Sequence, residues 1–256
     1  MNYGLQLLLI ALGLGSITFW IYQRKAELHT HPDASTLIVG TNAEYPPFTF
    51  KNQDGDIVGF DIDIVKEVAK RLNKKIELED MSFAVLIPKL QMGSLQIVAA
   101  GASPSPERES QVFFTKPYLT DDPLVIITRA DHAPLTCVAD LTGQEVIVND
   151  GFTADLYLSG FTGPIITRLP TVADAFLTLI SQRADAFVSA RSSVEPFFEH
   201  ADRSKFRITE LSNKFDSYVL IISRRYPELL TQVQHALDAM KQDGTIATIQ
   251  QKWNLS

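Results

Sequence analysis

The chain has 256 residues and a formal net charge of −7 at pH 7, with 45% hydrophobic and 21% charged residues. This composition is typical of a globular protein with its own core, and the length allows one large domain or two small ones. No run of Lys or Arg indicates a nucleic-acid-binding surface. The single cysteine, Cys137, excludes a disulfide within the chain, and the five histidines lack metal-ligand spacing such as HExxH. We therefore expect no nucleic-acid partner, no metal and no cofactor.

The N-terminal residues differ from the rest of the chain. An apolar run, Leu5–Tyr22, is followed by Arg24 and Lys25. Roughly 18 apolar residues are enough to span a bilayer and are near the upper length of a signal peptide. We predict that residues 1–28 form an export segment, either cleaved or retained as a membrane anchor, and that residues 29–35 form a polar linker. The basic pair after the run counts against export under the positive-inside rule, so this conflict stays open.

After the linker, strand patterns alternate with helix patterns. Short apolar runs rich in β-branched residues predict strands at 36–42 and 95–102, and alternation of apolar and polar residues predicts a strand at 75–81. Apolar residues at helical spacing predict helices at 60–75 and 82–94. We expect Asp61 to cap the first of these helices. The Asp54–Gly55 turn signal predicts a hairpin just before it.

The second half of the chain has the same rhythm. The expected strands are 123–129, 144–151, 165–170 and 217–223, and the expected helices are 152–160, 227–244 and 245–253, with a helix followed by a strand over 171–190. Such alternation predicts α/β sheets, in which ligands bind at the carboxyl ends of the strands. The corner GASPSPER (101–108) and the loop TNAEYPPF (41–48) lie at such ends.

Several of these segments resemble one known family. The stretches IVGTNAEYPPF, GFDIDIVKEVAKRL, FAVLIPKL, FTKPYL and KQDGTIATIQQKW, with the corner ending PER, resemble the amino-acid-binding family of bacterial periplasmic solute-binding proteins in order and spacing. These proteins are the receptors of polar amino-acid ABC importers. The resemblance covers residues 36–254. It implies a two-lobe α/β clamp that closes about a hinge, with lobe 1 formed by 36–119 and 215–256 and lobe 2 by 120–214.

The resemblance implies that the corner 101–108 binds the ligand's α-carboxylate. Arg108 would grip this carboxylate with its planar guanidinium fork. Ser103 and Ser105 would supply hydroxyls, and Gly101 would allow a close approach of the backbone. The alternatives are a surface arginine at a helix end and a plain Ser-Pro turn.

The other expected contacts come from both halves of the chain. Gly151 and Thr153 open a helix whose amides can meet an anion, and Thr153 matches a hydroxyl that helps to hold the carboxylate. Tyr45 and Phe83 match aromatic positions on either side of the ligand side chain, although Phe83 also fits a simple core position. Asn42 matches a position, often Asp, that meets the ligand's distal polar group.

One residue departs from the family pattern. The family usually carries an Asp that accepts the ligand's α-ammonium where this chain has Ala190. Either another carboxylate substitutes, with Asp150 and Glu195 near in sequence, or the alignment slips, or the ligand is not an ordinary α-amino acid. Asp185, by contrast, matches a structural position before the strand.

The resemblance implies a non-enzymatic receptor that binds a free polar amino acid, similar to glutamine or arginine, and delivers it to the membrane permease of an ABC importer. Such a protein would be a periplasmic monomer, either free or tethered to the inner membrane by its N-terminal segment. Two alternatives remain: an enzyme of the same fold, such as a cyclohexadienyl-type dehydratase, and a membrane-anchored sensor.

Overall fold

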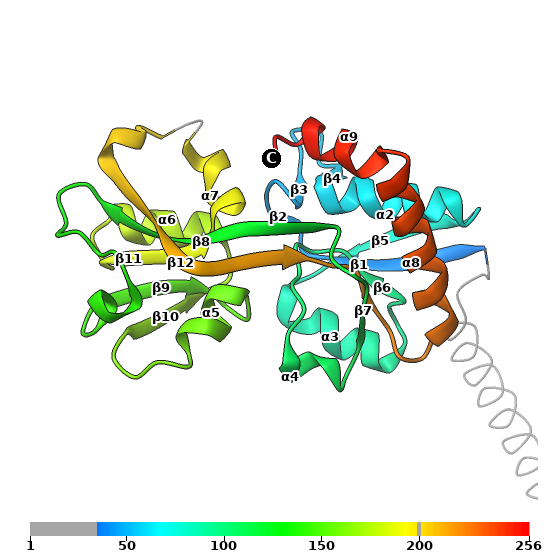
Figure 1. The fold of residues 1–256 in the computed structure, drawn as a ribbon, viewed down its shortest axis with the longest axis horizontal. Coiled ribbons are helices and arrows are strands. Elements are labelled where there is room, and N and C mark those ends of the chain that lie inside the picture. Colours follow the sequence, from blue (N-terminus) through cyan, green and yellow to red (C-terminus); the bar gives the residue numbers. More distant parts are fainter. Residues whose placement is uncertain (1–34, 199–200, 256) are drawn as a thin grey trace, which may run out of the picture.

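The computed structural model describes residues 35–198 and 201–255, which form two α/β lobes joined by two long strands (Figure 1). Within these ranges, no helix is both long enough and apolar enough to cross a membrane. The expected export segment, 1–28, and nearly all of the linker lie outside the described residues.

Lobe 1 is built on a five-stranded sheet of order β5-β1-β6-β13-β7. β1 pairs in parallel with β5 and β6, whereas β13 runs antiparallel to β6 and β7. The strands are β1 (Thr36–Thr41), β5 (Lys75–Asp80), β6 (Ile97–Val98), β7 (Phe113–Phe114) and β13 (Ile221–Ile222). The helices are α2 (Phe60–Arg71), α3 (Phe83–Met92), α4 (Pro106–Glu109), α8 (Pro227–Gln242) and α9 (Thr245–Lys252).

A small antiparallel sheet adjoins lobe 1. It consists of β2 (Glu44–Tyr45), β3 (Thr49–Lys51) and β4 (Ile57–Val58). The β3–β4 pair confirms the hairpin predicted from the Asp54–Gly55 turn.

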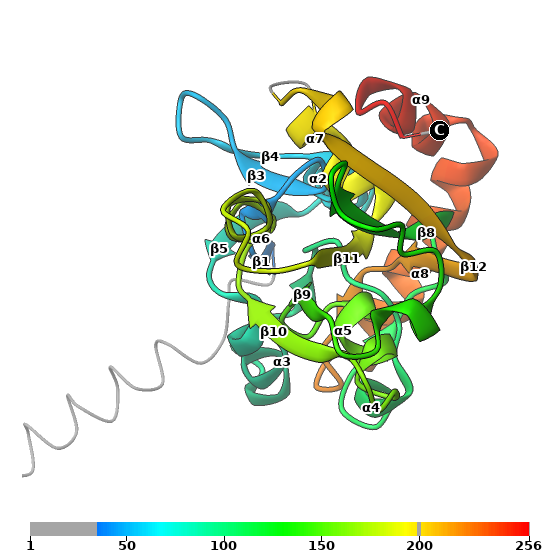
Figure 2. The same ribbon diagram turned by 90° about the vertical axis from the view of Figure 1, so that its left-hand side faces the viewer.

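Lobe 2 is built on a second five-stranded sheet, of order β10-β9-β11-β8-β12. Its strands are β8 (Leu119–Arg129), β9 (Glu145–Asn149), β10 (Ile165–Leu169), β11 (Ala186–Ala190) and β12 (Phe206–Tyr218). Its helices are α5 (Thr153–Leu158), α6 (Val172–Ile180) and α7 (Arg191–Phe198), with 3₁₀ turns at Val138–Leu141 and Arg203–Lys205. Figure 2 shows α5 on one face of this sheet and α6 and α7 on the other. Each face buries its own apolar cluster.

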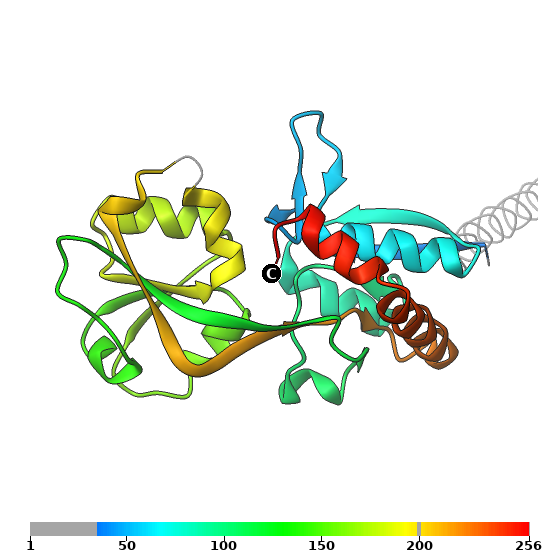
Figure 3. The same ribbon diagram turned by 45° about the horizontal axis from the view of Figure 1, so that its top comes forward.

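The strands β8 and β12 connect the two lobes. They pair antiparallel from Phe206 opposite Arg129 to Tyr218 opposite Leu119, with register shifts after Glu210 and after Asp216. Figure 3 shows both strands, green and orange, running from lobe 2 into lobe 1. A paired ribbon of two strands with irregular register suits a hinge, because its backbone can bend while most of its hydrogen bonds persist.

Helix α2 corrects one prediction. Its N-cap is Gly59 and has no side-chain capping bond, so the expected cap by Asp61 was wrong. The Asp61 side chain is fully buried and accepts a 2.7 Å hydrogen bond from the Gly101 N–H. Burial raises the pKa of Asp61 to about 7. The Asp61 carboxyl group therefore binds the backbone that follows β6 instead of capping its own helix.

Candidate ligand-binding site

A small pocket of about 200 Å³ lies between the two lobes. Its lining comprises the corner 101–108, the start of α5 at 151–153, and Phe83, Leu156 and Tyr157. The pocket thus brings together seven of the predicted residues: Gly101, Ser103, Ser105, Arg108, Phe83, Gly151 and Thr153. The carboxyl ends of β6 and β9 carry these segments, as expected for α/β sheets.

Arg108 reaches from lobe 1 to lobe 2. The short helix α4 begins at Pro106, directly after the extended residue Ser105. Arg108 lies in the single turn of this helix. One guanidinium nitrogen, Nη2, donates a 2.7 Å hydrogen bond to the Gly151 carbonyl, and the guanidinium lies 5.2 Å from the centre of the Phe83 ring. Burial lowers the pKa of Arg108, and within the described ranges no carboxylate forms an ion pair with it. The remaining N–H donors can therefore receive an anion.

Three aromatic rings pack in a row across the lobes. Phe152 lies between the two aromatic residues predicted to flank a ligand, with its ring centre 4.7 Å from that of Tyr45 and 4.9 Å from that of Phe83. The sequence analysis did not predict this role for Phe152, and an aromatic residue directly after Gly151 was the only signal for it. A ligand side chain can lie between Tyr45 and Phe83 only if Phe152 moves aside.

Tyr45 forms one end of this row of rings. Its side chain is buried and stacks on Phe48 at 5.4 Å. Gly101 has φ +61°, and a Cβ built there would lie 2.4 Å from the Tyr45 ring. Only glycine therefore lets the corner approach Tyr45, which agrees with the close backbone approach expected at this position.

Asp216 on β12 does not line the small pocket itself, but it binds two residues that do, and the sequence analysis did not predict this contact. The Ser103 hydroxyl from lobe 1 and the Thr153 hydroxyl from lobe 2 both donate to Asp216 Oδ1, the latter at 3.0 Å. The Ser217 N–H donates to the same oxygen at 2.9 Å. Burial raises the pKa of Asp216 to about 6, against the effect of these donors. No motif marks this residue, because only the crossing of the strands brings it to the hydroxyls of Ser103 and Thr153.

The remaining expected positions lie outside the small pocket. Asn42 is buried after β1, and its carbonyl accepts a 2.8 Å hydrogen bond from Glu44 N–H. Ala190 is buried at the end of β11 in an apolar cluster. Of the two acids considered as its substitutes, Glu195 is ion-paired with Arg203 at 2.6 Å, and Asp150 is exposed.

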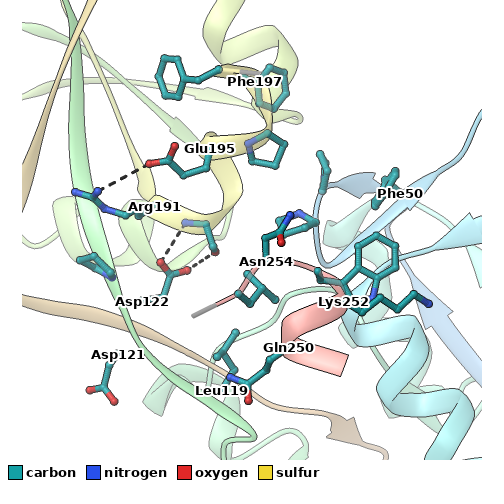
Figure 4. Close-up of a pocket in the computed structure, with 18 of the residues that line it drawn as sticks. Phe50, Leu119, Asp121, Asp122, Arg191, Glu195, Phe197, Gln250, Lys252 and Asn254 are labelled. Atoms are coloured by element: carbon teal, nitrogen blue, oxygen red, sulfur yellow. Dashed lines mark hydrogen bonds and ion pairs between the residues drawn. The ribbon is translucent and has the colours of Figure 1, made fainter. Parts of the chain in front are cut away.

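A larger cleft of about 1000 Å³ lies between α7 of lobe 2 and the C-terminal part of lobe 1 (Figure 4). In the close-up, Asp122 lies with Arg191 and Glu195, across the cleft from Phe50 and Asn254. The three basic side chains that line the cleft are already ion-paired: Arg191 with Glu210, Arg203 with Glu195, and Lys252 with Asp63. The cleft therefore offers less unpaired positive charge than the small pocket does.

Metal chemistry has no support in the parts of the chain that the structure describes. There, no group of three His, Cys, Asp or Glu side chains is arranged to hold a metal ion. The site consists instead of a guanidinium, hydroxyls, aromatic rings and buried carboxyls, which suit the binding of a small zwitterion.

Two α/β lobes that hold a polar pocket between them and are joined by crossing strands define a solute-binding clamp of the periplasmic-binding-protein type. Residues 37–256 match the family model of the bacterial extracellular solute-binding proteins, family 3. The chain belongs to this family.

Individual relatives agree with the assignment. The chain is 30% identical over 220 residues to the arginine-binding extracellular protein ArtP of Bacillus subtilis, covering 85% of each chain. An ancestral arginine-binding protein bound to glutamine has a similar structure, with a TM-score of 0.80, 32% identity, and coverage of 88% of this chain and all of the other. An ancestral amino-acid-binding protein described as a precursor of cyclohexadienyl dehydratase has a TM-score of 0.77 and 33% identity, with coverage of 86% and 95%.

Proposed function

We propose that this protein is an extracytoplasmic receptor for an amino acid with a long polar side chain, similar to arginine or glutamine, which it delivers to an ABC importer. The observation that carries the proposal is the unpaired Arg108 guanidinium at a pocket lined by both lobes. The relatives named for arginine binding, one of them bound to glutamine, support the choice of ligand.

In this proposal the ligand joins the lobes. Its carboxylate binds Arg108 from lobe 1 and the start of α5 from lobe 2, where the Thr153 hydroxyl turns from Asp216 to the ligand. Its side chain lies between Tyr45 and Phe83 after Phe152 has moved aside. Because groups of both lobes contact one ligand, binding favours the closed arrangement, and β8 and β12 act as the hinge.

The wider proposal follows the same family. Residues 36–119 with 215–256 form lobe 1, and residues 120–214 form lobe 2. The protein works as a monomer with the permease of the importer, outside the cytoplasm, and it binds its ligand without chemical turnover or nucleic acid. Residues 1–28 export it and are either cleaved or retained as an anchor.

The test is a thermal-shift screen of the purified protein with the twenty amino acids and with carboxylates that lack an α-amino group. A ligand at a thousandfold excess over Kd stabilises the folded state by about 4 kcal/mol, which raises the Tm by several degrees. A selective rise with arginine or glutamine is expected. A rise with none of the amino acids would contradict the proposal.

The enzyme alternative has its own readout in the same experiment. Each ligand that stabilises the protein is incubated with it, and the solution is followed by NMR. A receptor returns the ligand unchanged, whereas a dehydratase converts it to a new product.

A further inference from the structure

Two acids face each other on the crossing strands. Asp122 on β8 and Asp216 on β12 are directly opposite in the antiparallel register. Asp122 is 9% exposed and Asp216 4% exposed. Like charges directly opposite across two strands destabilise a sheet, and burial increases the cost of each charge. When both carboxyl groups are charged, this pair therefore lowers the stability of the ligand-free protein.

No basic side chain within residues 35–198 and 201–255 offsets this pair by an ion pair. Asp122 is held by the Ser192 hydroxyl and N–H and by the Tyr218 hydroxyl, the last at 2.5 Å. Arg191 is the only cation that favours its charged form, and Arg191 is itself ion-paired with Glu210. Asp216 is held only by hydroxyls and a backbone N–H. A buried carboxylate in this position is complementary to a cation from outside the chain.

The pocket geometry links Asp216 to the ligand. The three hydrogen bonds that Asp216 accepts within the described residues all end on Oδ1, and none of them occupies Oδ2. The hydroxyls of Ser103 and Thr153 that donate to it also line the small pocket. A second group in that pocket, the Ser105 hydroxyl, is buried without any hydrogen-bond partner. Buried polar groups without a partner are rare in folded proteins, and a ligand bound in this pocket would give the Ser105 hydroxyl one.

We propose that Asp216 is the acceptor of the ligand's α-ammonium group and that Asp122, directly opposite, adds to the negative electrostatic potential that attracts it. This inference rests on the proposed function, and it names a specificity determinant that comes from the hinge. In an α-amino acid the ammonium and the carboxylate are attached to the same carbon. A carboxylate that already contacts Ser103 and Thr153 therefore lies where the ammonium arrives when the ligand carboxylate binds Arg108. Neither Ala190 nor the ion-paired Glu195 can accept it.

The experiment compares two probes by calorimetry, L-arginine and δ-guanidinovalerate, which is arginine without its α-amino group. We expect the wild-type protein to bind L-arginine at least about tenfold more tightly than δ-guanidinovalerate, as for a hydrogen bond to a charged group. Asp216→Asn reduces this preference to less than about threefold, because the neutral amide of asparagine keeps the shape but loses the charge. Asp54→Asn is the matched control, since it makes the same substitution at an exposed carboxylate outside the pocket.

A second measurement needs no variant. The groups that face Asp216 are Asp122 on β8, Tyr45 on β2 and Tyr218 on β12, and burial keeps both tyrosines protonated. As the pH falls through about 6, Asp216 gains a proton, so L-arginine affinity falls while δ-guanidinovalerate affinity stays constant.

The outcomes separate the two proposals. If the wild-type protein binds no amino acid, the proposed function fails and this inference fails with it. If it prefers L-arginine tenfold and Asp216→Asn keeps that preference, or both probes show the same pH dependence, only the role of Asp216 is overturned.

Discussion

Arg108 in lobe 1 donates a 2.7 Å hydrogen bond to the Gly151 carbonyl in lobe 2. This one contact joins the end of β6 to the end of β9, two segments that belong to different sheets. A guanidinium that holds the two lobes together through one N–H keeps further donors for a ligand, so closure and binding use the same side chain.

We expect Arg108→Ala to weaken L-arginine binding by about 2–5 kcal/mol, because the ligand carboxylate loses its charged partner. Arg108→Lys restores only part of the affinity, since an ammonium lacks the planar fork. Calorimetry measures both. Arg224→Ala is the matched control. Arg224 also lies over a phenylalanine ring and donates to a backbone carbonyl, but it lines neither the small pocket nor the larger cleft. Equal losses in Arg108→Ala and Arg224→Ala would contradict the assignment.

We expect Phe152→Ala to raise L-arginine affinity several-fold, because the ligand no longer has to displace Phe152 from between Tyr45 and Phe83. The same change lowers the free energy of unfolding of the free protein by about 1–3 kcal/mol through the loss of two ring contacts. Calorimetry and urea unfolding measure the two effects. Leu177→Ala, an exposed apolar side chain on α6 of the same lobe, is the control. A fall in affinity would mean that Phe152 itself contacts the ligand.

Two glycines with positive φ allow backbone strain to be separated from crowding. An alanine at Gly55 meets nothing within 4 Å, whereas an alanine at Gly101 meets the Tyr45 ring. Each substitution lowers the free energy of unfolding by on the order of 1 kcal/mol, because alanine disfavours the left-handed backbone conformation. Only Gly101→Ala displaces Tyr45, so it loses more stability and also weakens ligand binding. Thermal unfolding and calorimetry of the two variants check this, and matching behaviour of both would refute the close approach.

Asp61 makes stability depend on pH in a direction that can be checked. Its pKa is about 7 in the folded protein and 3.8 is its ordinary value, so the folded state holds the proton more tightly. Stability therefore falls as the pH rises from about 4 to about 7. Asp61→Asn keeps an acceptor for the Gly101 N–H and removes a pH-dependent change on the order of a few kcal/mol. Urea unfolding across this pH range measures it.

The control for this change is Asp54→Asn, whose side chain is exposed in the β3–β4 turn. It should leave the pH dependence of unfolding as in the wild type. If Asp61→Asn also leaves it unchanged, the Asp61 carboxyl is not the group that releases the proton.

The sequence by itself determined the α/β class, most of the strands and helices, and the segments that form the pocket. It did not predict α7, and the single strand expected at 217–223 is the end of β12 followed by β13. Periodicity and turn chemistry are local, so the hairpin at Asp54–Gly55 and the helix from Phe60 to Arg71 follow from neighbouring residues. The corner 101–108 was recognisable for the same reason, since its serines, prolines and Arg108 are contiguous.

Only the tertiary structure decided the roles of residues that act at a distance. Asp61 binds the backbone N–H of Gly101, 40 residues away, instead of capping α2. Asp216 meets Ser103 across 113 residues, and Phe152 enters the space between Tyr45 and Phe83 from the other lobe. Burial and long-range contacts govern these side chains, and neither is encoded in spacing along the chain. The Asp61 contact depends on how α2 packs within lobe 1, and the contacts of Asp216 and Phe152 depend on how β8 and β12 bring the two lobes together.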